Sequence, residues 1–460
     1  MKLKLSLLLT SLILVVSILM TSCASRATDY NVIDAQINEN GELILTYENG
    51  EQHNLGVVVG DQGEDGATGA AGKDGTNAGK GADGKNGVDG ADGKLVITSD
   101  GSSIPAASAK GLRSAVSIIT TFKTTVQQGG YRPGAGSTTT QEYAAAGSGV
   151  IYKMDRGEGD AYIITNYHVV YDSSSNTANG ISDDIKVYLY GSEIEGKAMS
   201  ATYVGGSLYY DIAVLHIDNN DILRESDAIA VDIADSDLVR VGDTAIAIGN
   251  AKGYGTSASL GVVCVDSEYI NMYAADNKTQ VSFRVMRVDA AVNSGNSGGG
   301  LYDDEGNLIG IVNAKEIEDG VENIGYAIPS KVAVSVADNI IHYCAGTSVE
   351  RVQRSMIGIS VSITDSNAVY DSQTGAVTIM ETVAVSDITS GSLADGKFNK
   401  GDVLVSATIG EKTINITRQY HVIDLMLDTR VGDKVTFKIL RGGVEAAVEV
   451  TITQACLIEY

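Results

Sequence analysis

Ser297 lies in the segment NSGNSGGGL, residues 293–301, with four glycines within three positions of it. Glycine has no Cβ atom, so backbone N–H groups beside such a serine can turn toward a bound group. A serine hydroxyl next to exposed N–H groups suits nucleophilic attack on a carbonyl carbon, because the N–H groups can stabilise the resulting oxyanion. A serine and glycine run by itself is more often a turn, so this chemistry depends on the partners of the serine.

A nucleophilic serine needs an imidazole to take its proton and a carboxylate to orient that imidazole. The chain has five histidines, and His168 in IITNYHVV directly follows an apolar stretch, where a loop can present it. Asp211 opens the apolar run DIAVLHI, and its burial there requires a hydrogen-bond partner such as a histidine N–H. The order His168, Asp211, Ser297 is the chymotrypsin-type order and not that of subtilisin or the α/β-hydrolases.

Short apolar strands separated by turn residues would position these side chains. They are rich in Val, Ile, Tyr and Ala, and they read GSGVIYK, AYIITNY, DIKVYLY, YDIAVLHI, DTAIAIGN, SLGVVCV, VSFRVMRV and LIGIVNAK. Helical periodicity is scarce before residues 330–343. Many short strands joined by loops favour a barrel or a sandwich over alternating strands and helices, so we expect a mostly β fold.

Five sequence blocks resemble successive blocks of HtrA/DegP-type serine proteases. They are GSGVIYK…AYIITNYHVV, YDIAVLHID, AIAIGNAKGYGTSASLGVVC, VDAAVNSGNSGGGLYDDEGNLIGIV and GYAIPS. The resemblance implies a chymotrypsin-like domain of two six-stranded β-barrels, near residues 110–232 and 238–332, with the active site in the cleft between them. It also implies that Ser297 is the nucleophile, His168 the general base and Asp211 the acid that orients it. The family's reaction requires no cofactor and no metal.

The resemblance also assigns roles around the nucleophile. Gly295 and Ser297 would supply the N–H donors of the oxyanion hole, with Asn296 between them. Ala291 lies six residues before the nucleophile, where related proteases form the base of the pocket for the residue preceding the cut bond. Because this position carries no charge, we expect cleavage after Val, Ile or Ala, with Leu tolerated and Lys and Arg rejected. Gly300 stands where the family usually has proline or alanine, which removes no catalytic group.

Residues 346–460 resemble a PDZ domain of the kind that HtrA proteases carry. The segment RSMIGISV precedes an apolar region with glycines, a helical run RQYHVIDLMLD and the strand-like GDKVTFKILRGG. The resemblance implies that the loop of Met356, Ile357, Gly358 and Ile359 offers N–H groups to the C-terminal carboxylate of a peptide, while the peptide adds as a β-strand. The alternative is a general α+β appendage.

Residues 1–22 predict a leader peptide. MKLK supplies a short basic start, and residues 5–20 form an uncharged apolar run that is typical of a signal peptide and short for a membrane span. The following LMTSCAS resembles the lipobox of bacterial lipoproteins, which implies cleavage before Cys23 and diacylation of its thiol. Met20 stands where leucine is usual, and a plain secretory signal is the alternative. Both interpretations predict an extracytoplasmic protein, and the first predicts a membrane lipoprotein at the cell surface.

Three segments connect this leader to the rest of the chain. Residues 23–59 alternate apolar and polar residues around Asn-Gly pairs, which predicts a small β module used as a spacer. Residues 60–94 repeat Gly-X-Y with one break and contain no proline. Such a repeat forms either a collagen-like triple helix or a flexible tether, and the sequence leaves both open. We expect a linker at residues 95–107 and the protease domain at residues 108–345.

The formal net charge of −25 argues against nucleic acid as a partner, because like charges repel. We expect Cys264, where the family commonly has serine, Cys344 and Cys456 to be buried free thiols, with a Cys344–Cys456 disulfide as the alternative. The sequence thus favours a surface-anchored serine endopeptidase that cleaves unfolded or exposed envelope proteins. The alternative is a non-catalytic adhesin or peptide-binding scaffold. The family resemblance and a triple helix each imply a homotrimer.

Overall fold

The computed structural model divides the chain into two compact units, residues 1–91 and residues 92–460. It describes residues 32–37, 42–47, 50, 52–57, 103–128, 137–177, 179–193, 196–314, 324–372 and 375–460. The predicted leader peptide, Cys23 and the Gly-X-Y repeat lie outside the described residues. The first unit contains an antiparallel sheet in the order β1-β2-β3, formed by β1 (Val32–Ile37), β2 (Glu42–Tyr47) and β3 (Gln52–Val57).

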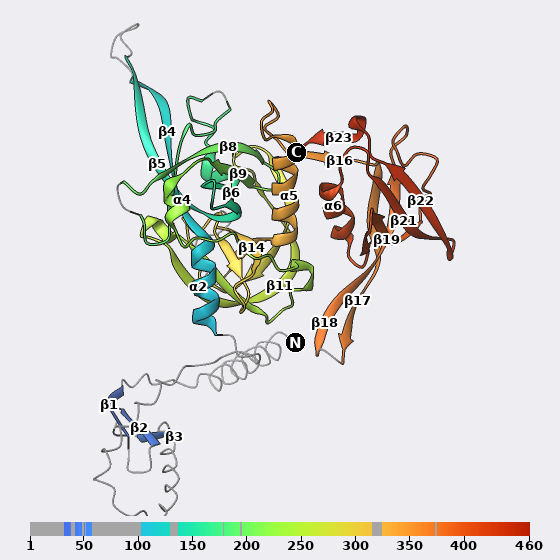
Figure 1. The fold of residues 1–460 in the computed structure, drawn as a ribbon. Helices are drawn as coiled ribbons and strands as arrows, with labels where there is room; N and C mark the ends of the chain where they lie inside the picture. The colour runs from blue at the N-terminus through green and yellow to red at the C-terminus, as the bar shows by residue number, and fades with distance from the viewer. Residues whose placement is uncertain are drawn as a thin grey trace, which may run out of the picture. The chain divides into compact units, whose positions relative to one another are not determined.

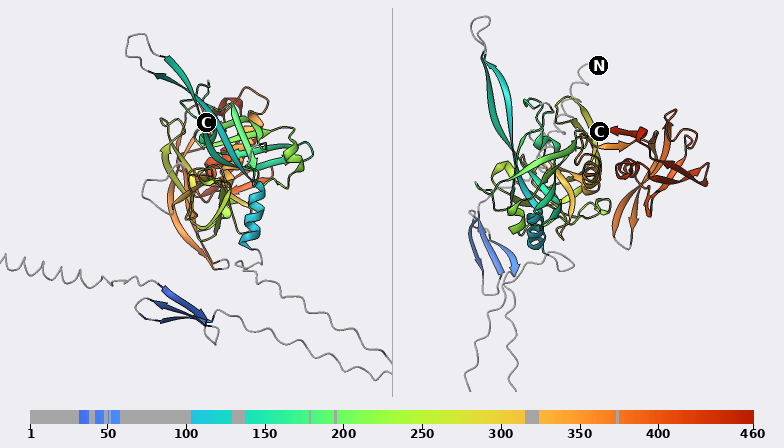
Figure 2. Two further views of the ribbon diagram at one scale, coloured as in Figure 1. Left: turned by 90° about the vertical axis from the view of Figure 1, so that its left-hand side faces the viewer. Right: turned by 45° about the horizontal axis from the view of Figure 1, so that its top comes forward.

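Two closed six-stranded β-barrels make up most of the second unit (Figure 1). In the first barrel the strand order is β4-β5-β6-β9-β8-β7. Its strands are β4 (Ala115–Gln128), β5 (Ser137–Asp155), β6 (Asp160–Thr165), β7 (Asp184–Leu189), β8 (Met199–Ser207) and β9 (Ile212–Ile217). The far ends of β4 and β5 project beyond the barrel as a long hairpin in both views of Figure 2.

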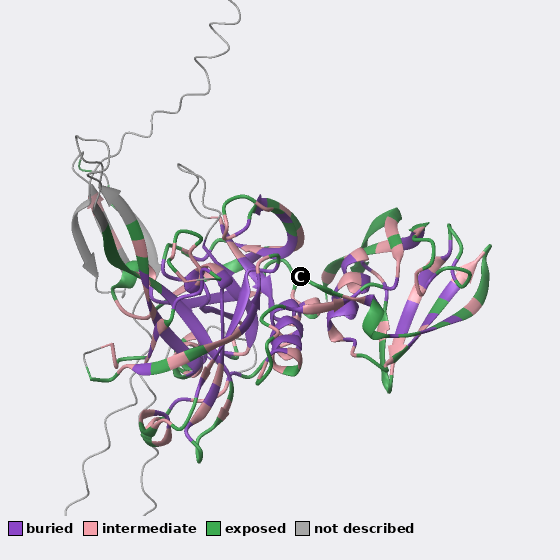
Figure 3. Ribbon diagram, turned by 90° about the horizontal axis from the view of Figure 1, so that it is seen from above, coloured by how far each residue is buried: buried purple, intermediate pink, exposed green. Residues whose placement is uncertain are grey.

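The second barrel has the strand order β10-β11-β12-β15-β14-β13. Its strands are β10 (Thr244–Gly249), β11 (Ser257–Tyr273), β12 (Gln280–Val288), β13 (Gly300–Tyr302), β14 (Leu308–Asn313) and β15 (Gly325–Pro329). Buried residues are concentrated in the barrels (Figure 3), and every residue of β14 is buried. The two barrels confirm the expected mostly β, chymotrypsin-like fold.

Helix α2 (Ile104–Ser114) begins inside the range that the sequence predicts to be a linker. The Ser103 side chain accepts a hydrogen bond from the N–H of Ala106 and so caps the helix, and proline occupies its first turn. The residues that α2 buries are small, namely Ala107, Gly111 and Ser114. A Cβ atom on Gly111 would lie 2.6 Å from the Ile248 side chain in the second barrel. Small buried residues give little apolar periodicity, which explains why the pattern does not predict this helix.

The remaining helices near the barrels are short, apart from α5. They are α3 (Tyr167–Val170), α4 (Asp221–Glu225), the 3-10 helices η1 (Ser236–Leu238) and η2 (Ala251–Gly253), and α5 (Ser330–Tyr343). The three described cysteines are free thiols, so Cys344 and Cys456 form no disulfide. Those two are buried as expected, but Cys264 is exposed, and the expectation for it was wrong. Val263 points inward from β11, and strand alternation therefore turns Cys264 outward.

The described C-terminal part of this unit contains a six-stranded sheet, a two-stranded sheet and a ten-residue α-helix. The strand order is β17-β18-β19-β21-β22, with β20 paired to β19, while β16 pairs with β23. The elements are β16 (Gln353–Ser355), β17 (Ile359–Asp371), β18 (Ala376–Ile388), β19 (Val403–Ile409), β20 (Lys412–Asn415), α6 (Gln419–Asp428), β21 (Lys434–Arg441), β22 (Val444–Thr451), η3 (Gln454–Cys456) and β23 (Leu457–Glu459).

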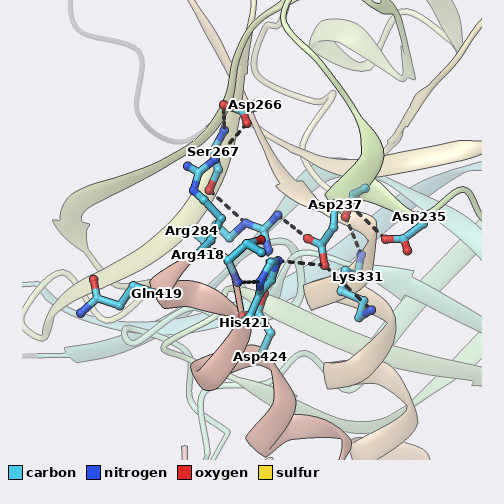
Figure 4. Close-up of polar contacts among 12 residues, drawn as sticks. Asp235, Asp237, Asp266, Ser267, Arg284, Lys331, Arg418, Gln419, His421 and Asp424 are labelled. Carbon is cyan, nitrogen blue, oxygen red and sulfur yellow. Dashed lines mark hydrogen bonds and ion pairs between the residues drawn. The ribbon is translucent and has the colours of Figure 1, made fainter. Parts of the chain in front are cut away.

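A buried ionic cluster joins helix α6 to the second barrel (Figure 4). The Arg284 guanidinium donates to Asp424 of α6 at 2.6 Å and to Asp237 of η1 at 2.7 Å. The Tyr420 ring lies against the same guanidinium, 3.5 Å from centroid to Cζ. Arg418 extends the cluster by pairing with Asp266 at 3.2 Å. These contacts hold the C-terminal part against the barrel through charges that are shielded from solvent.

Candidate active site

His168 of α3 faces Asp211, which directly precedes β9. The imidazole Nδ1 lies 2.6 Å from Asp211 Oδ2, and the backbone N–H of His168 donates to Oδ1 at 3.0 Å. An ionised carboxylate only accepts hydrogen bonds, so this contact places the imidazole proton on Nδ1 and leaves the Nε2 lone pair free. A neutral imidazole in this tautomer can take a proton from a hydroxyl group.

Asp211 is buried, and its hydrogen bonds compensate for the loss of water. Its φ of 50° lies in the left-handed region that residues other than glycine rarely adopt. Besides His168, the Nδ2 of Asn313 donates to Oδ2 at 3.0 Å. The Asp211 carbonyl accepts from the N–H of Tyr167 and from Nδ2 of Asn166, which fixes the turn. Sequence reasoning missed Asn313, whose signal is a polar residue at the end of the apolar strand β14.

Each of the four glycines around Ser297 is needed because other atoms lie where a Cβ atom would be. A Cβ atom on Gly295 would collide with the Asn250 carbonyl oxygen, and one on Gly298 with the carbonyl oxygen of Ser148 and the Thr165 hydroxyl. Similar collisions occur at Gly299 with the Ile248 carbonyl oxygen and at Gly300 with the Tyr302 ring. Ser148 and Thr165 belong to the first barrel and Ile248 to the second. The glycines therefore let the serine loop pack where strands of both barrels meet.

Two backbone N–H groups beside Ser297 are available to a bound anion. The N–H groups of Gly295 and Ser297 donate to no residue that the structure describes. The N–H of Asn296 donates to the carbonyl oxygen of Asn293 at 2.9 Å, so it is already in use. Gly295 also has a φ of 96°, which glycine adopts readily. Of the three residues expected at the oxyanion hole, Gly295 and Ser297 therefore have free N–H donors.

The Ser297 hydroxyl lies next to the segment that carries Asn313, one of the hydrogen-bond partners of Asp211. Its Oγ accepts a hydrogen bond from the N–H of Ala314 at 3.3 Å, and Ala314 directly follows Asn313, which contacts Asp211. Among the described residues, no hydrogen bond joins Oγ to the His168 imidazole, and the hydroxyl proton has no acceptor. Hydrogen bonds between nucleophile and base are often long in unliganded sites and tighten when substrate binds.

Ala291 lies on one side of the serine loop with its side chain exposed. Its carbonyl oxygen accepts from the Ser259 hydroxyl at 2.9 Å and from Asn296 Nδ2 at 3.4 Å. The nearest acid in sequence, Asp289, accepts a hydrogen bond from the N–H of Val262 at 2.6 Å and so has a structural partner. Residues 315–323 lie outside the described residues. The pocket assignment of Ala291 therefore stays a prediction.

Chymotrypsin-like serine peptidases consist of two antiparallel β-barrels, with a histidine, an aspartate and a serine where the barrels meet. The two barrels and the glycine-framed serine of this chain have that architecture. Residues 147–311 match the family described as "Trypsin-like peptidase domain". The chain is 30% identical over 363 residues to Serine protease Do-like HtrA of Bacillus subtilis (strain 168), covering 77% of this chain and 74% of that protein. It is 32% identical over 333 residues to Periplasmic serine endoprotease DegP of Escherichia coli (strain K12), covering 71% and 61%. The chain belongs to the HtrA family of serine proteases, and it is a serine endopeptidase.

Proposed function

We propose that Ser297, His168 and Asp211 hydrolyse peptide bonds through an acyl-enzyme. His168 Nε2 takes the proton as Ser297 Oγ attacks the carbonyl carbon, and the N–H groups of Gly295 and Ser297 stabilise the oxyanion. His168 then protonates the leaving amine, and water repeats the sequence to release the acid. Asp211 stays ionised and orients the imidazole. The 2.6 Å contact between His168 Nδ1 and Asp211 is the observation that supports the proposal best.

Replacing Ser297 with alanine tests this mechanism with β-casein as substrate. We expect cleavage by the purified enzyme to fall by at least about 10³-fold, because the acyl-enzyme cannot form. Ser294→Ala is the matched control, since Ser294 lies in the same loop and its side chain is exposed. An inactive parent would support the alternative of an adhesin or peptide-binding scaffold, and undiminished cleavage by Ser297→Ala would overturn the assignment of the nucleophile.

We also propose that the C-terminal part binds peptide C-termini as a PDZ domain. Of the four residues expected in the carboxylate-binding loop, Met356, Ile357 and Gly358 precede β17 and Ile359 is its first residue. Among the described strands, β17 lies at the end of the sheet and pairs with β18. The N–H of Met356 donates to the Cys456 carbonyl oxygen, but those of Ile357 and Gly358 donate to no described residue. Two free N–H groups at the start of an open strand edge support capture of a carboxylate.

A pair of peptides tests the carboxylate site. A fluorescent peptide with a free, apolar C-terminus should bind to the Ser297→Ala variant, and its C-terminal amide should bind at least about tenfold more weakly, the effect of roughly 1.4 kcal/mol. Replacing Gly358 with alanine should weaken the binding of the peptide with a free C-terminus. Gly358 has a φ of 88°, and the Cβ atom of an alanine there would collide with Ser392. Equal affinities for the two peptides would favour the general α+β appendage.

We further propose that the enzyme acts outside the cytoplasm and is anchored through lipid on Cys23. The charge-free apolar run before LMTSCAS supports this assignment. Within the part of the chain that the structure describes, no helix is long and apolar enough to cross a membrane. Mass spectrometry of the mature N-terminus tests the anchor, because a lipoprotein begins at a diacylated Cys23. An unmodified N-terminus elsewhere would favour a plain secretory signal. Unfolded or exposed envelope proteins are the proposed substrates.

A further inference from the structure

Ser148 of β5 connects the first barrel to the loop that carries the nucleophile. It is 0% exposed, and all of its polar groups form hydrogen bonds. Its N–H donates to the Ser297 carbonyl oxygen at 2.9 Å, and its own carbonyl accepts from the Thr165 hydroxyl at 2.7 Å. Its hydroxyl lies 2.7 Å from the Gly295 carbonyl oxygen and 2.7 Å from the Asn250 nitrogen. Three of these four bonds reach the second barrel or its loops.

The direction of the hydroxyl bonds follows from the chemistry of the groups. The Asn250 N–H can only donate, so it occupies a lone pair on Ser148 Oγ. The hydroxyl proton is therefore donated to the Gly295 carbonyl oxygen, which can only accept a hydrogen bond. The hydroxyl therefore has a single orientation and fixes the direction of the Gly295 carbonyl.

This carbonyl belongs to the peptide between the two free N–H groups. The other end of that peptide, the N–H of Asn296, donates to Asn293, so both ends of the peptide are held. The neighbouring carbonyls are held as well, that of Ser294 by the N–H of Lys252 at 2.7 Å and that of Asn296 by the N–H of Gly299 at 2.9 Å. The N–H groups of Gly295 and Ser297 alone remain unpaired among these peptides.

Glycine gives the loop its close approach but supplies no steric barrier to rotation. Without the Ser148 hydroxyl, the Gly295 carbonyl would lose its acceptor contact and the Gly295–Asn296 peptide could turn. We infer that Ser148 is a positioning residue that keeps the oxyanion N–H groups of Gly295 and Ser297 aimed at the substrate. The inference rests on the proposed function of Ser297 and deepens it, because Ser148 would act on the transition state without touching the substrate.

Replacing Ser148 with alanine tests the inference in the full mature enzyme. The readouts are kcat and KM for a fluorogenic peptide, inhibition by a peptide aldehyde and by the matching peptide alcohol, and the melting temperature. When the aldehyde carbon bonds to Ser297 Oγ, His168 takes the hydroxyl proton, and the aldehyde oxygen carries the negative charge that the N–H groups bind. The alcohol forms no such oxyanion. We expect kcat to fall about 10- to 100-fold, less than the 10²- to 10³-fold typical for loss of a whole oxyanion donor. KM should stay within about threefold, and the inhibition constant should rise for the aldehyde alone.

Ser330→Ala is the matched control, because Ser330 is also 0% exposed and its hydroxyl also donates to a backbone carbonyl oxygen, that of Ala234 at 2.8 Å, outside the serine loop. Ser148→Cys is a second variant of similar size with a weaker donor, and it should show the same selective loss of kcat. Equal loss for the aldehyde and the alcohol, a matching loss in Ser330→Ala, or failure of both Ser148 variants to fold would overturn the inference. If Ser148→Ala matches the parent while Ser297→Ala is inactive, the inference alone fails. Cleavage by Ser297→Ala would instead refute the proposed function.

Discussion

At the scale of single residues, the carboxylate of Asp211 can orient His168 only while its own position is fixed. Its left-handed backbone conformation turns the carboxylate toward α3, where two N–H groups of His168 reach it. Asn313 supplies a third donor from the opposite barrel. Hydrogen bonds to a buried charge are among the stronger ones in proteins, at roughly 1.5–3 kcal/mol. Asn313 therefore links the alignment of the histidine to the packing of the two barrels.

Replacing Asn313 with alanine should lower kcat/KM for a fluorogenic peptide by about 10- to 100-fold, because one hydrogen bond to the Asp211 carboxylate is lost. Asp211→Asn should cost more, about 10⁴-fold, because the amide no longer selects the Nδ1-protonated imidazole. Asn367→Ala, at an exposed position of β17, is the control. Unchanged kinetics in Asn313→Ala would show that the two His168 contacts suffice to hold Asp211.

Single residues also determine which residue the enzyme accepts before the cut bond. A pocket without charge near Ala291 would leave a bound Lys or Arg unpaired, at a cost of several kcal/mol, while each buried CH₂ contributes about 0.8 kcal/mol. We therefore expect cuts mainly after Val, Ile or Ala, with Leu tolerated. A survey of cleavage sites in a denatured proteome, using residues 95–460, measures this preference. A majority of cuts after Lys or Arg would contradict the pocket assignment.

At the scale of elements, the sequence predicts those strands and helices whose apolar residues recur with a regular period. Runs such as AYIITNY predict the short strands of both barrels. The order of His168, Asp211 and Ser297 in the chain predicts the triad. Contacts between elements distant in sequence were missed. Ser148 lies in the quoted run GSGVIYK, but its bonds to Asn250 and Gly295 exist because β5 meets two loops that are each more than a hundred residues away in sequence. Helix α2 was missed because it packs through small residues.

The junction between α6 and the second barrel carries a pH-dependent charge. Burial raises the pKa of Asp424 to about 6; the Arg284 guanidinium opposes this shift, and the negative charges of Asp237 and Asp428 add to it. Since the carboxyl pKa in the unfolded chain is near 3.9, folding favours the protonated form between about pH 4 and pH 6. The stabilising contribution of this group is therefore complete below about pH 4 and is lost as the pH rises through about 6.

Replacing Asp424 with asparagine should remove that dependence, which amounts to at most about 3 kcal/mol in the free energy of unfolding. The measurement compares melting temperatures of parent and variant at intervals from pH 4 to pH 7. The difference between the two proteins should change over this range in favour of the variant as the pH rises. Asp218→Asn, at an exposed position, should run parallel to the parent. A parallel curve for Asp424→Asn would mean that Asp424 stays ionised in the folded protein.

At the scale of the whole molecule, the Gly-X-Y repeat sets how far the protease could work from the anchor proposed at Cys23. Residues 60–94 would span on the order of 100 Å in the extended conformation of a collagen-like triple helix, at about 3.1 Å per residue. A flexible coil of the same length would have an end-to-end distance of about 35 Å. The triple helix requires three chains, and the tether requires one. Oligomeric state therefore decides which of the two forms is available.

Removing residues 24–94, which include the Gly-X-Y repeat, separates two possible sources of a trimer. The family resemblance implies trimers formed through the protease domain, so we expect residues 95–460 to sediment as trimers at micromolar concentration. This fragment keeps Ser103 and the whole of α2, whereas a cut at residue 108 would remove the cap and the first turn that stabilise the helix. The chain from residue 24 onward, which retains the repeat, is the control. If the control is trimeric and residues 95–460 are monomeric, the segment of residues 24–94 that contains the repeat brings the chains together. If both are monomeric, neither source operates and the tether is the form that a single chain can adopt.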